Sequence, residues 1–217
     1  MYTIYQNTVD NFLFRDILKI VFRIGGTINM YTMCITEKTA QQQIQFEDTF
    51  LQMLLETHYD DITISELCRR AGLSRKIFYR LFEKKADVLY SMLDRALLES
   101  DCYTPEEPGN HTELYRFLAY WLQKKDLLDA LLKHQNSSML TDRAIQIAKN
   151  HMSSPVRSFG PKEVQGSPEA IVFYLSGIFS TLLIWHEQGF NQSVEELEQL
   201  MLFILTTPAM KSPTEYH

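Results

Sequence analysis

The sequence has few of the residues that interrupt helices, with only 8 glycines and 7 prolines among 217 residues. It also lacks any alternation of apolar and polar residues long enough to predict a β-strand. Instead, apolar residues recur at helical spacing in most of the chain. Because 45% of the residues are apolar, the length allows one or two domains with a core. We therefore expect an all-α protein.

Cysteine is scarce as well, and the motifs of common enzymes are missing. Cys34, Cys68 and Cys102 are an odd number and lack the spacing of metal ligands, so we expect reduced thiols and no metal site. We find no nucleophile elbow, no phosphate-binding glycine loop and no His-Glu metal motif. We therefore expect a protein that is not an enzyme and has neither catalytic residues nor a cofactor.

Near the N-terminus the apolar residues do not form an unbroken run. Residues 12–28 are rich in Phe, Ile and Leu, but Arg15, Asp16, Lys19 and Arg23 interrupt them. This pattern excludes an ordinary spanning helix and makes a poor signal peptide, so we expect no membrane partner. Residues 1–36 are an extension of open status. Either the natural start lies further along, at Met30 or Met33, or the extension is an accessory amphipathic helix, which we favour.

Positive charge is concentrated in one short segment of an acidic chain. The chain has a net charge of −6, yet residues 63–85 carry seven Lys or Arg against two Glu. A chain of this net charge cannot bind nucleic acid through its overall field, whereas one basic face on an acidic body suits a specific duplex-binding domain. The alternative is a solvated basic face on an ordinary helical hairpin.

The order of residues in the same segment favours two short helices joined by a tight turn. Thr63 and Glu66 have the spacing of a reciprocal capping box, which places a helix start near Ile64. Gly72 suits a left-handed residue that ends this helix. Ser74 can then cap a second helix, whose apolar residues are spaced for burial and whose basic residues are left outside. This arrangement predicts a helix-turn-helix that binds DNA.

These residues resemble the DNA-binding domain of the tetracycline-repressor (TetR) family of one-component bacterial regulators. The family pattern has a Thr opening the second helix, a small residue and Gly at the turn, then Ser, an aromatic, Tyr, another aromatic and Lys. The matching residues are Thr63, Ala71, Gly72, Ser74, Phe78, Tyr79, Phe82 and Lys85. The resemblance implies an N-terminal three-helix helix-turn-helix domain, followed by a helical ligand-binding and dimerisation domain.

The resemblance also implies which residues bind double-stranded DNA. The N-terminal residues of the second helix would face base edges in the major groove, with Arg75 the best candidate for a bidentate contact with guanine. The remaining residues would position the helix, several of them on phosphates. The expected DNA-binding residues are Thr63, Ser74, Arg75, Lys76, Phe78, Tyr79, Lys84 and Lys85.

We expect a DNA-binding domain over residues 37–100 and a regulatory and dimerisation domain over residues 101–217. The first helix of the DNA-binding domain would cover residues 38–59, and a linking helix would cover residues 86–100. Prolines and glycine in residues 101–111 predict the linker between the domains. Residues 153–167, with two prolines and two glycines, predict a long exposed loop.

The last two expected helices predict a homodimer. Residues 168–188 are apolar nearly all round, so one face should be buried against something outside the subunit. Small residues there would let helices approach closely, and the resemblance implies a two-fold four-helix bundle. The alternative is a purely intramolecular core. The expected interface residues are Ser176, Gly177, Phe179, Ser180, Leu183, Leu200, Phe203 and Ile204.

Family members respond to small molecules, and aromatic residues of the body could line a pocket. The candidates are Phe117, Tyr120, Trp121, His134, Met139, Phe173 and Tyr174. The alternative is that this aromatic stripe is simply core. Because the body is acidic, an effector would be apolar or aromatic and neutral or weakly cationic.

Together these observations predict a cytoplasmic transcriptional repressor. It would bind an inverted-repeat operator as a homodimer and be released by a small-molecule effector. The alternative is an adaptor dimer of similar architecture that acts through a protein partner and binds DNA weakly.

Overall fold

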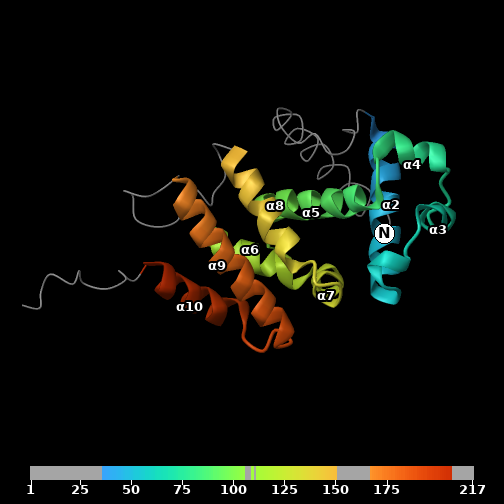
Figure 1. Cartoon of the computed structure of the whole chain (residues 1–217). Helices are drawn as coiled ribbons and strands as arrows, with labels where there is room; N and C mark the ends of the chain where they lie inside the picture. The colour runs from blue at the N-terminus through green and yellow to red at the C-terminus, as the bar shows by residue number, and fades with distance from the viewer. Residues whose placement is uncertain (1–35, 106–108, 110, 151–166, 207–217) are drawn as a thin grey trace, which may run out of the picture. The chain divides into compact units, whose positions relative to one another are not determined.

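The computed structural model describes residues 36–105, 109, 111–150 and 167–206, and within these residues the secondary structure is entirely helical, as expected. The expected N-terminal extension up to residue 35 and most of the predicted loop after residue 152 lie outside the described residues. The helices are α2 (Glu37–Glu56), η1 (Tyr59–Asp61, a 3₁₀ turn), α3 (Ile64–Arg70), α4 (Arg75–Leu81), α5 (Lys85–Cys102), α6 (Glu113–Leu122), α7 (Lys125–Lys133), α8 (Ser137–Asn150), α9 (Pro168–Glu187) and α10 (Val194–Thr206) (Figure 1).

The backbone contacts divide the chain into two units. The first unit comprises Met1–Cys102 and Asp126–Arg143, and the second comprises Tyr103–Lys125 and Ala144–His217. The first stretch of the first unit ends at Cys102, which lies at the start of the linker expected over residues 101–111. Residues 126–143, which we expected in the regulatory domain, make their contacts with the first unit.

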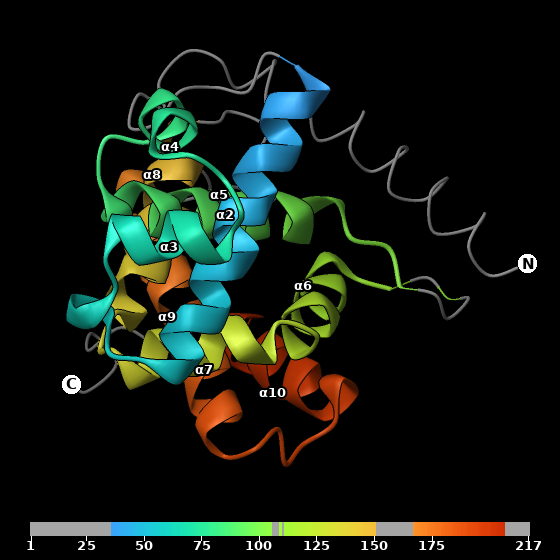
Figure 2. The ribbon, with the colours of Figure 1, turned by 90° about the vertical axis from the view of Figure 1, so that its right-hand side faces the viewer.

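Helix α2 is the support of the first unit, because both α3 and α5 pack on it (Figure 2). A capping box between Thr36 and Thr39 starts the helix, although the sequence pattern did not predict one. The helix ends at Glu56, three residues before the expected end, because Thr57 is extended and η1 follows. Apolar residues recur at helical spacing along α2: Phe46, Phe50 and Leu54 are buried, whereas Ile44, Leu51 and Leu55 are half-buried.

A buried carboxylate joins α2 to α5. Glu47 has no exposed surface and accepts hydrogen bonds from Ser91 and from Gln43, the latter at 2.9 Å. Its other oxygen accepts from Nε of Arg95 at 2.6 Å. The neighbouring carboxylates hold the pKa of Arg95 well above its usual value against the opposing effect of desolvation, with Glu47 the strongest of them. The guanidinium group of Arg95 therefore carries its charge throughout the physiological pH range.

The residue before Arg95 joins α5 to α8. Asp94 and Arg143 are both buried and form a bidentate pair, in which Nε of Arg143 donates to Oδ1 of Asp94 at 2.7 Å and a second nitrogen donates to Oδ2. The guanidinium group also lies 5.5 Å from the ring centre of Tyr90. Adjacent residues of opposite charge thus hold α5 to two different helices.

The second unit is built around α6, which packs against α9 and α10. The rings of Phe117 and Trp121 on α6 meet Phe179 on α9, with centroid distances of 5.4 and 6.0 Å. Ser167 caps α9 and Pro168 is its first residue, in agreement with the expected start at residue 168. The indole N–H of Trp185 donates to the carbonyl of Gln192, which fixes the turn into α10.

Helix α9 is long and apolar enough to span a membrane by length and composition, and it is the one such helix among the described residues. Nearly half of its apolar window is buried within the protein. Ile171, Leu175, Ile178 and Leu182 form that buried stripe. A core helix of a globular protein passes the same test, so we assign α9 to the core.

The Asp94–Arg143 pair gives a stability prediction. Asp94→Asn keeps the shape of the side chain but leaves the buried guanidinium of Arg143 without that counter-charge, so we expect a loss of about 3 kcal/mol or more in the free energy of unfolding. Urea unfolding followed by circular dichroism measures it. Asp48→Asn, at an exposed carboxylate of α2, is the matched control and should change stability by less than about 0.5 kcal/mol. Equal effects of the two substitutions would contradict the prediction.

Candidate nucleic-acid interface

The turn between α3 and α4 has the geometry that the sequence predicts. Gly72 has φ of +64°, a left-handed conformation in which side-chain-bearing residues are strained. Its N–H donates to the carbonyl of Arg69 at 3.3 Å, and the N–H of Leu73 donates to the carbonyl of Cys68 at 3.0 Å. These two bonds form a Schellman motif, which ends α3 and turns the chain into α4.

The caps of the two helices agree with expectation in part. The hydroxyl of Thr63 accepts from the N–H of Glu66 at 3.2 Å, and that of Ser74 accepts from the N–H of Ile77 at 3.3 Å. The predicted return bond from the side chain of Glu66 to Thr63 is wrong. Glu66 instead accepts from Arg69, at 2.8 and 2.6 Å, and from Arg70 at 3.0 Å.

This cluster controls the charge of α3. Hydrogen bonds from Arg69, and next from Arg70, lower the pKa of Glu66 to about 2, so its carboxylate stays ionised near neutral pH. Arg70 also pairs with Glu56 at the end of α2. The two arginines of α3 are thus bound to carboxylates. The positive charge that is not compensated in this way lies on α4 and on the residues after it.

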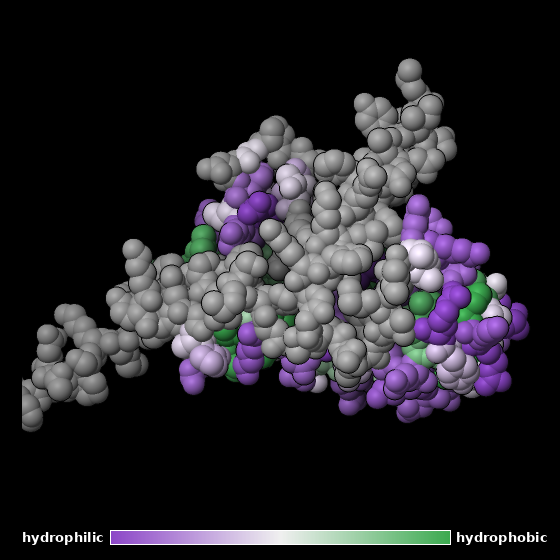
Figure 3. All heavy atoms as spheres, turned by 90° about the horizontal axis from the view of Figure 1, so that it is seen from above, coloured by the Kyte–Doolittle hydropathy of each residue, from purple (hydrophilic) through white to green (hydrophobic). Residues whose placement is uncertain are grey.

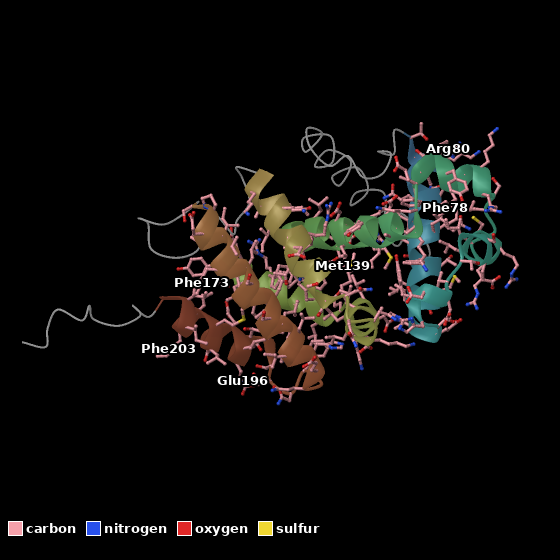
Figure 4. All side chains as sticks on the ribbon, viewed as in Figure 1. Phe78, Arg80, Met139, Phe173, Glu196 and Phe203 are labelled. Carbon is pink, nitrogen blue, oxygen red and sulfur yellow. The ribbon has the colours of Figure 1, made fainter. Side chains whose placement is uncertain are left out.

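The buried side of α4 rests on an aromatic cluster. Phe46 on α2 lies 5.4 Å from Phe78 and 6.0 Å from Phe82, measured between ring centroids, and all three rings are buried. Phe78 was expected among the DNA-binding residues. Its complete burial, seen between α4 and α2 in Figure 4, means that its side chain supports the helix from behind and does not reach a duplex.

The other side of α4 is exposed and basic. Arg75, Lys76 and Lys84 are exposed, and Tyr79 has 53% of its surface exposed although its ring packs edge-on against Phe78. In Figure 3 hydrophilic side chains gather over the part of the first unit formed by α2 to α4. Arg75 and Lys76 lie four and three positions before Tyr79 on α4, so these three exposed residues form one face, and Lys84 follows shortly after the helix ends.

Two contacts from α2 hold this face, and the sequence pattern did not identify them. Oε1 of Gln42 accepts from Arg80 at 2.6 Å, and Nε2 of Gln45 donates to the carbonyl of Ala71 at 2.7 Å. Arg80 points away from the core in Figure 4. A glutamine gives no sign in the sequence of which distant group it meets, so only the three-residue spacing of Gln42 and Gln45 on α2 could have suggested a shared face.

Lys85 makes the most extensive contacts of the predicted DNA-binding residues. Its Nζ donates to the carbonyls of Tyr59 at 2.7 Å, Asp60 at 3.2 Å and Ile62 at 3.1 Å. It also lies 4.3 Å from the ring centre of Tyr59. The side chain is half-buried and faces the chain that enters α3.

The predicted pocket residues are divided between the two units. Phe117, Tyr120 and Trp121 belong to the second unit, where their rings are neighbours. His134 and Met139 belong to the first unit. Both ring nitrogens of His134 contact main chain: Nδ1 accepts from the N–H of Tyr59 at 3.4 Å and Nε2 lies 2.7 Å from the carbonyl of Leu54.

Trp121 has a feature that the sequence could not show. Its side chain is fully buried, and its indole N–H has no hydrogen-bond acceptor among the described residues. A buried donor of this kind is costly unless it meets a partner. As for metals, no three His, Cys, Asp or Glu side chains in the described ranges are grouped as ligands.

The predicted dimer residues differ in exposure: Ser176 and Leu183 are half-buried, Phe179 is buried, and the exposed ones are Gly177, Ser180, Leu200, Phe203 and Ile204. Phe179 is buried in the second unit against Phe117 and Trp121, so its side chain belongs to the core and not to an exposed face. The exposed apolar residues of α9 are Val172, Phe173 and Ile184, and those of α10 are Leu200, Phe203 and Ile204. Phe173 and Phe203 project on the same side of these helices in Figure 4.

Comparison with known proteins identifies the fold. No family model and no curated protein matches the sequence. A TetR transcriptional regulator from Streptococcus agalactiae 2603V is similar in structure, with a TM-score of 0.56 over 77% of this chain and 95% of that one, at 20% sequence identity. A tetR-family transcriptional regulator from Streptomyces coelicolor has a TM-score of 0.48, with 76% of this chain and 79% of that one covered, also at 20% identity. The first likeness shows that this chain has a TetR-like fold.

Proposed function

We propose that this protein is a DNA-binding transcriptional regulator of the TetR type, which acts in the cytoplasm as a repressor. The observation that carries the proposal is the exposed basic face of α4, formed by Arg75, Lys76 and Tyr79 on a helix whose other side is locked into an aromatic core. A helix of this kind, preceded by a capped helix and a tight turn, fits the major groove of B-DNA. The similar structure from Streptococcus agalactiae 2603V is that of a TetR transcriptional regulator, which supports this role.

Each exposed residue has a role that follows from its chemistry. Arg75, at the first position of α4, would donate two hydrogen bonds to O6 and N7 of a guanine. Lys76 and the hydroxyl of Ser74 would meet neighbouring bases, and Tyr79 and Lys84 would meet phosphates, which fix the register of the helix without reading sequence. Thr63 would hold the adjacent strand from the start of α3.

This role predicts the effect of removing Arg75. The purified protein should enrich an inverted repeat from random duplexes, and Arg75→Ala should bind that repeat about 10- to 100-fold more weakly while its binding to unrelated DNA changes little. Fluorescence anisotropy at two salt concentrations measures both.

Lys149→Ala is the matched control, since it removes one exposed positive charge from the second unit. It should leave the affinity unchanged. Absence of any enriched sequence, with equal weak binding by wild type and Arg75→Ala, would refute the regulator and favour an adaptor that acts through a protein partner.

The proposed regulator is a homodimer that pairs through α9 and α10. Phe173 and Ile184 on α9 and Ile204 on α10 have 73%, 53% and 64% of their surface exposed, which is unusual for large apolar residues. Gly177 and Ser180 lie between Phe173 and Ile184 on the same side of α9 and would let a second copy approach closely. A two-fold dimer presents two copies of α4 to half-sites roughly 34–36 Å apart, which requires an inverted repeat.

The dimer predicts a change in molecular mass. Ile184→Glu places a charge in the middle of the exposed apolar face, so we expect a monomer in sedimentation equilibrium at concentrations where wild type is a dimer. Gln52→Glu adds the same charge on the exposed side of α2 and should remain dimeric. A monomeric wild type, or an Ile184→Glu dimer as stable as that of the control, would exclude this interface.

The proposed effector binds in the second unit beside Trp121. The buried indole N–H there can donate to an acceptor on a ligand, and the surrounding rings of Phe117, Tyr120 and Phe179 favour an apolar or aromatic molecule. The acidic character of the chain outside residues 63–85 favours a neutral or weakly cationic one. Binding would favour a form of the dimer that no longer fits the operator.

A set of aromatic amides and ketones tested by thermal shift should include molecules that stabilise the wild type. Trp121→Phe, which removes the N–H donor, should weaken their binding by about fivefold to tenfold. Trp185→Phe is the control, because the N–H of Trp185 already donates to Gln192. Equal affinities for both variants would place the effector elsewhere.

A further inference from the structure

Lys85 is the first residue of α5, and its ammonium group is fully engaged inside the protein. A lysine ammonium carries three N–H donors. Here the carbonyls of Tyr59, Asp60 and Ile62 accept from it at 2.7, 3.2 and 3.1 Å. Three converging carbonyl dipoles therefore supply the negative pole that a phosphate would otherwise offer this cation.

The ring of Tyr59 completes the site. Its centre lies 4.3 Å from Nζ, within the range of a cation–π contact. The ring is held in turn by Phe50 on α2, edge-on at 6.2 Å between centroids. Both ends of the contact are half-buried, so the cation is partly shielded from water, and it would lose all four interactions if it turned outward to a duplex.

The position of these contacts in the chain shows what they join. The three carbonyls lie just before α3, which begins at Ile64, and Lys85 lies just after α4, which ends at Leu81. The Lys85 side chain thus joins the segment before α3 to the segment after α4. Because α3, the Gly72 turn and α4 lie between the joined points, the tie fixes both ends of the segment that carries the exposed basic face.

The preceding residue is different in each of these respects. Lys84 is exposed, and its main-chain N–H donates to Oδ2 of Asp87 at 2.9 Å, as does that of Glu83. Asp87 is buried, so the backbone at Lys84 is held while the side chain lies in solvent. Of the two adjacent lysines, the geometry leaves Lys84 at the surface where a phosphate would be.

We propose that Lys85 is a positioning residue, which closes the helix-turn-helix by binding the carbonyls of residues 59–62, and that Lys84 alone of the two lysines contacts a DNA phosphate. The second half of this proposal rests on the DNA binding proposed above. The first half concerns the free protein and does not depend on DNA.

The experiment compares the salt dependence of binding to the enriched duplex for Lys84→Met and Lys85→Met. Losing one phosphate contact lowers the slope of log K against log salt by about 0.9, so Lys84→Met should show that reduction. Lys85→Met should bind about tenfold more weakly with the slope of the wild type, since it disturbs the position of α3 and α4 without removing a phosphate contact.

Charge-conserving variants separate the two roles further. Lys84→Arg should bind like wild type, because a guanidinium group also pairs with phosphate. Lys85→Arg should not be rescued, because a planar guanidinium cannot direct its N–H groups to three carbonyls that converge on one point. Wild-type affinity of Lys85→Arg, or a slope reduced by about 0.9 in Lys85→Met, would overturn the proposal.

Thermal unfolding without DNA tests the first half alone. Lys85→Met and Lys85→Arg should both have melting temperatures several degrees below that of wild type. Lys84→Met should have the melting temperature of wild type. If Lys85→Met fails to fold, Lys85→Arg carries the comparison. Equal melting temperatures of the Lys84 and Lys85 variants would refute the tie, whereas a wild type that enriches no duplex would refute the proposed function and leave this result standing.

Discussion

The first unit depends on the contacts of two adjacent residues of α2. Phe46 packs beneath α4 through the rings of Phe78 and Phe82, and Glu47 binds Ser91 and Arg95 on α5. Consecutive residues of a helix point about 100° apart, so one apolar and one ionic contact can be made to two different neighbours. A buried carboxylate is tolerated only when it is paired and hydrogen-bonded, and Glu47 is both. The orientation of the exposed basic face relative to α5 follows from this pair of contacts.

Much of the fold could be predicted from the sequence, because its signals are local. Gly72, Ser74, Ser167 and Pro168 mark helix ends through their own conformational preferences, and the structure places the helix ends there. The burial of Phe50 and Leu54 follows from helical spacing in the same way. These rules work because each involves residues no more than a few positions apart.

The errors have a different cause, since they concern which of several possible partners a side chain meets. Glu66 has the spacing of a capping box, but the two arginines that follow compete successfully for its carboxylate. Phe179 could belong to the core or to an interface by periodicity alone, and only the rings of Phe117 and Trp121 decide the matter. In the candidate site, exposure of Arg75 and Lys76 was predictable from helical phase, whereas the carbonyls bound by Lys85, 23 to 26 residues earlier in the chain, were not.

The separation of buried and exposed residues on α4 has a consequence for which positions can change. Phe78 and Leu81 are buried and hold the helix, while Arg75 and Lys76 are exposed, as is more than half of Tyr79, whose ring packs edge-on against Phe78. Surface substitutions cost little stability, so the exposed positions can vary while the buried ones are kept. The chemistry of this exposed face can therefore change by single mutations without loss of the fold, and the fold itself is shared at 20% sequence identity with the TetR transcriptional regulator from Streptococcus agalactiae 2603V.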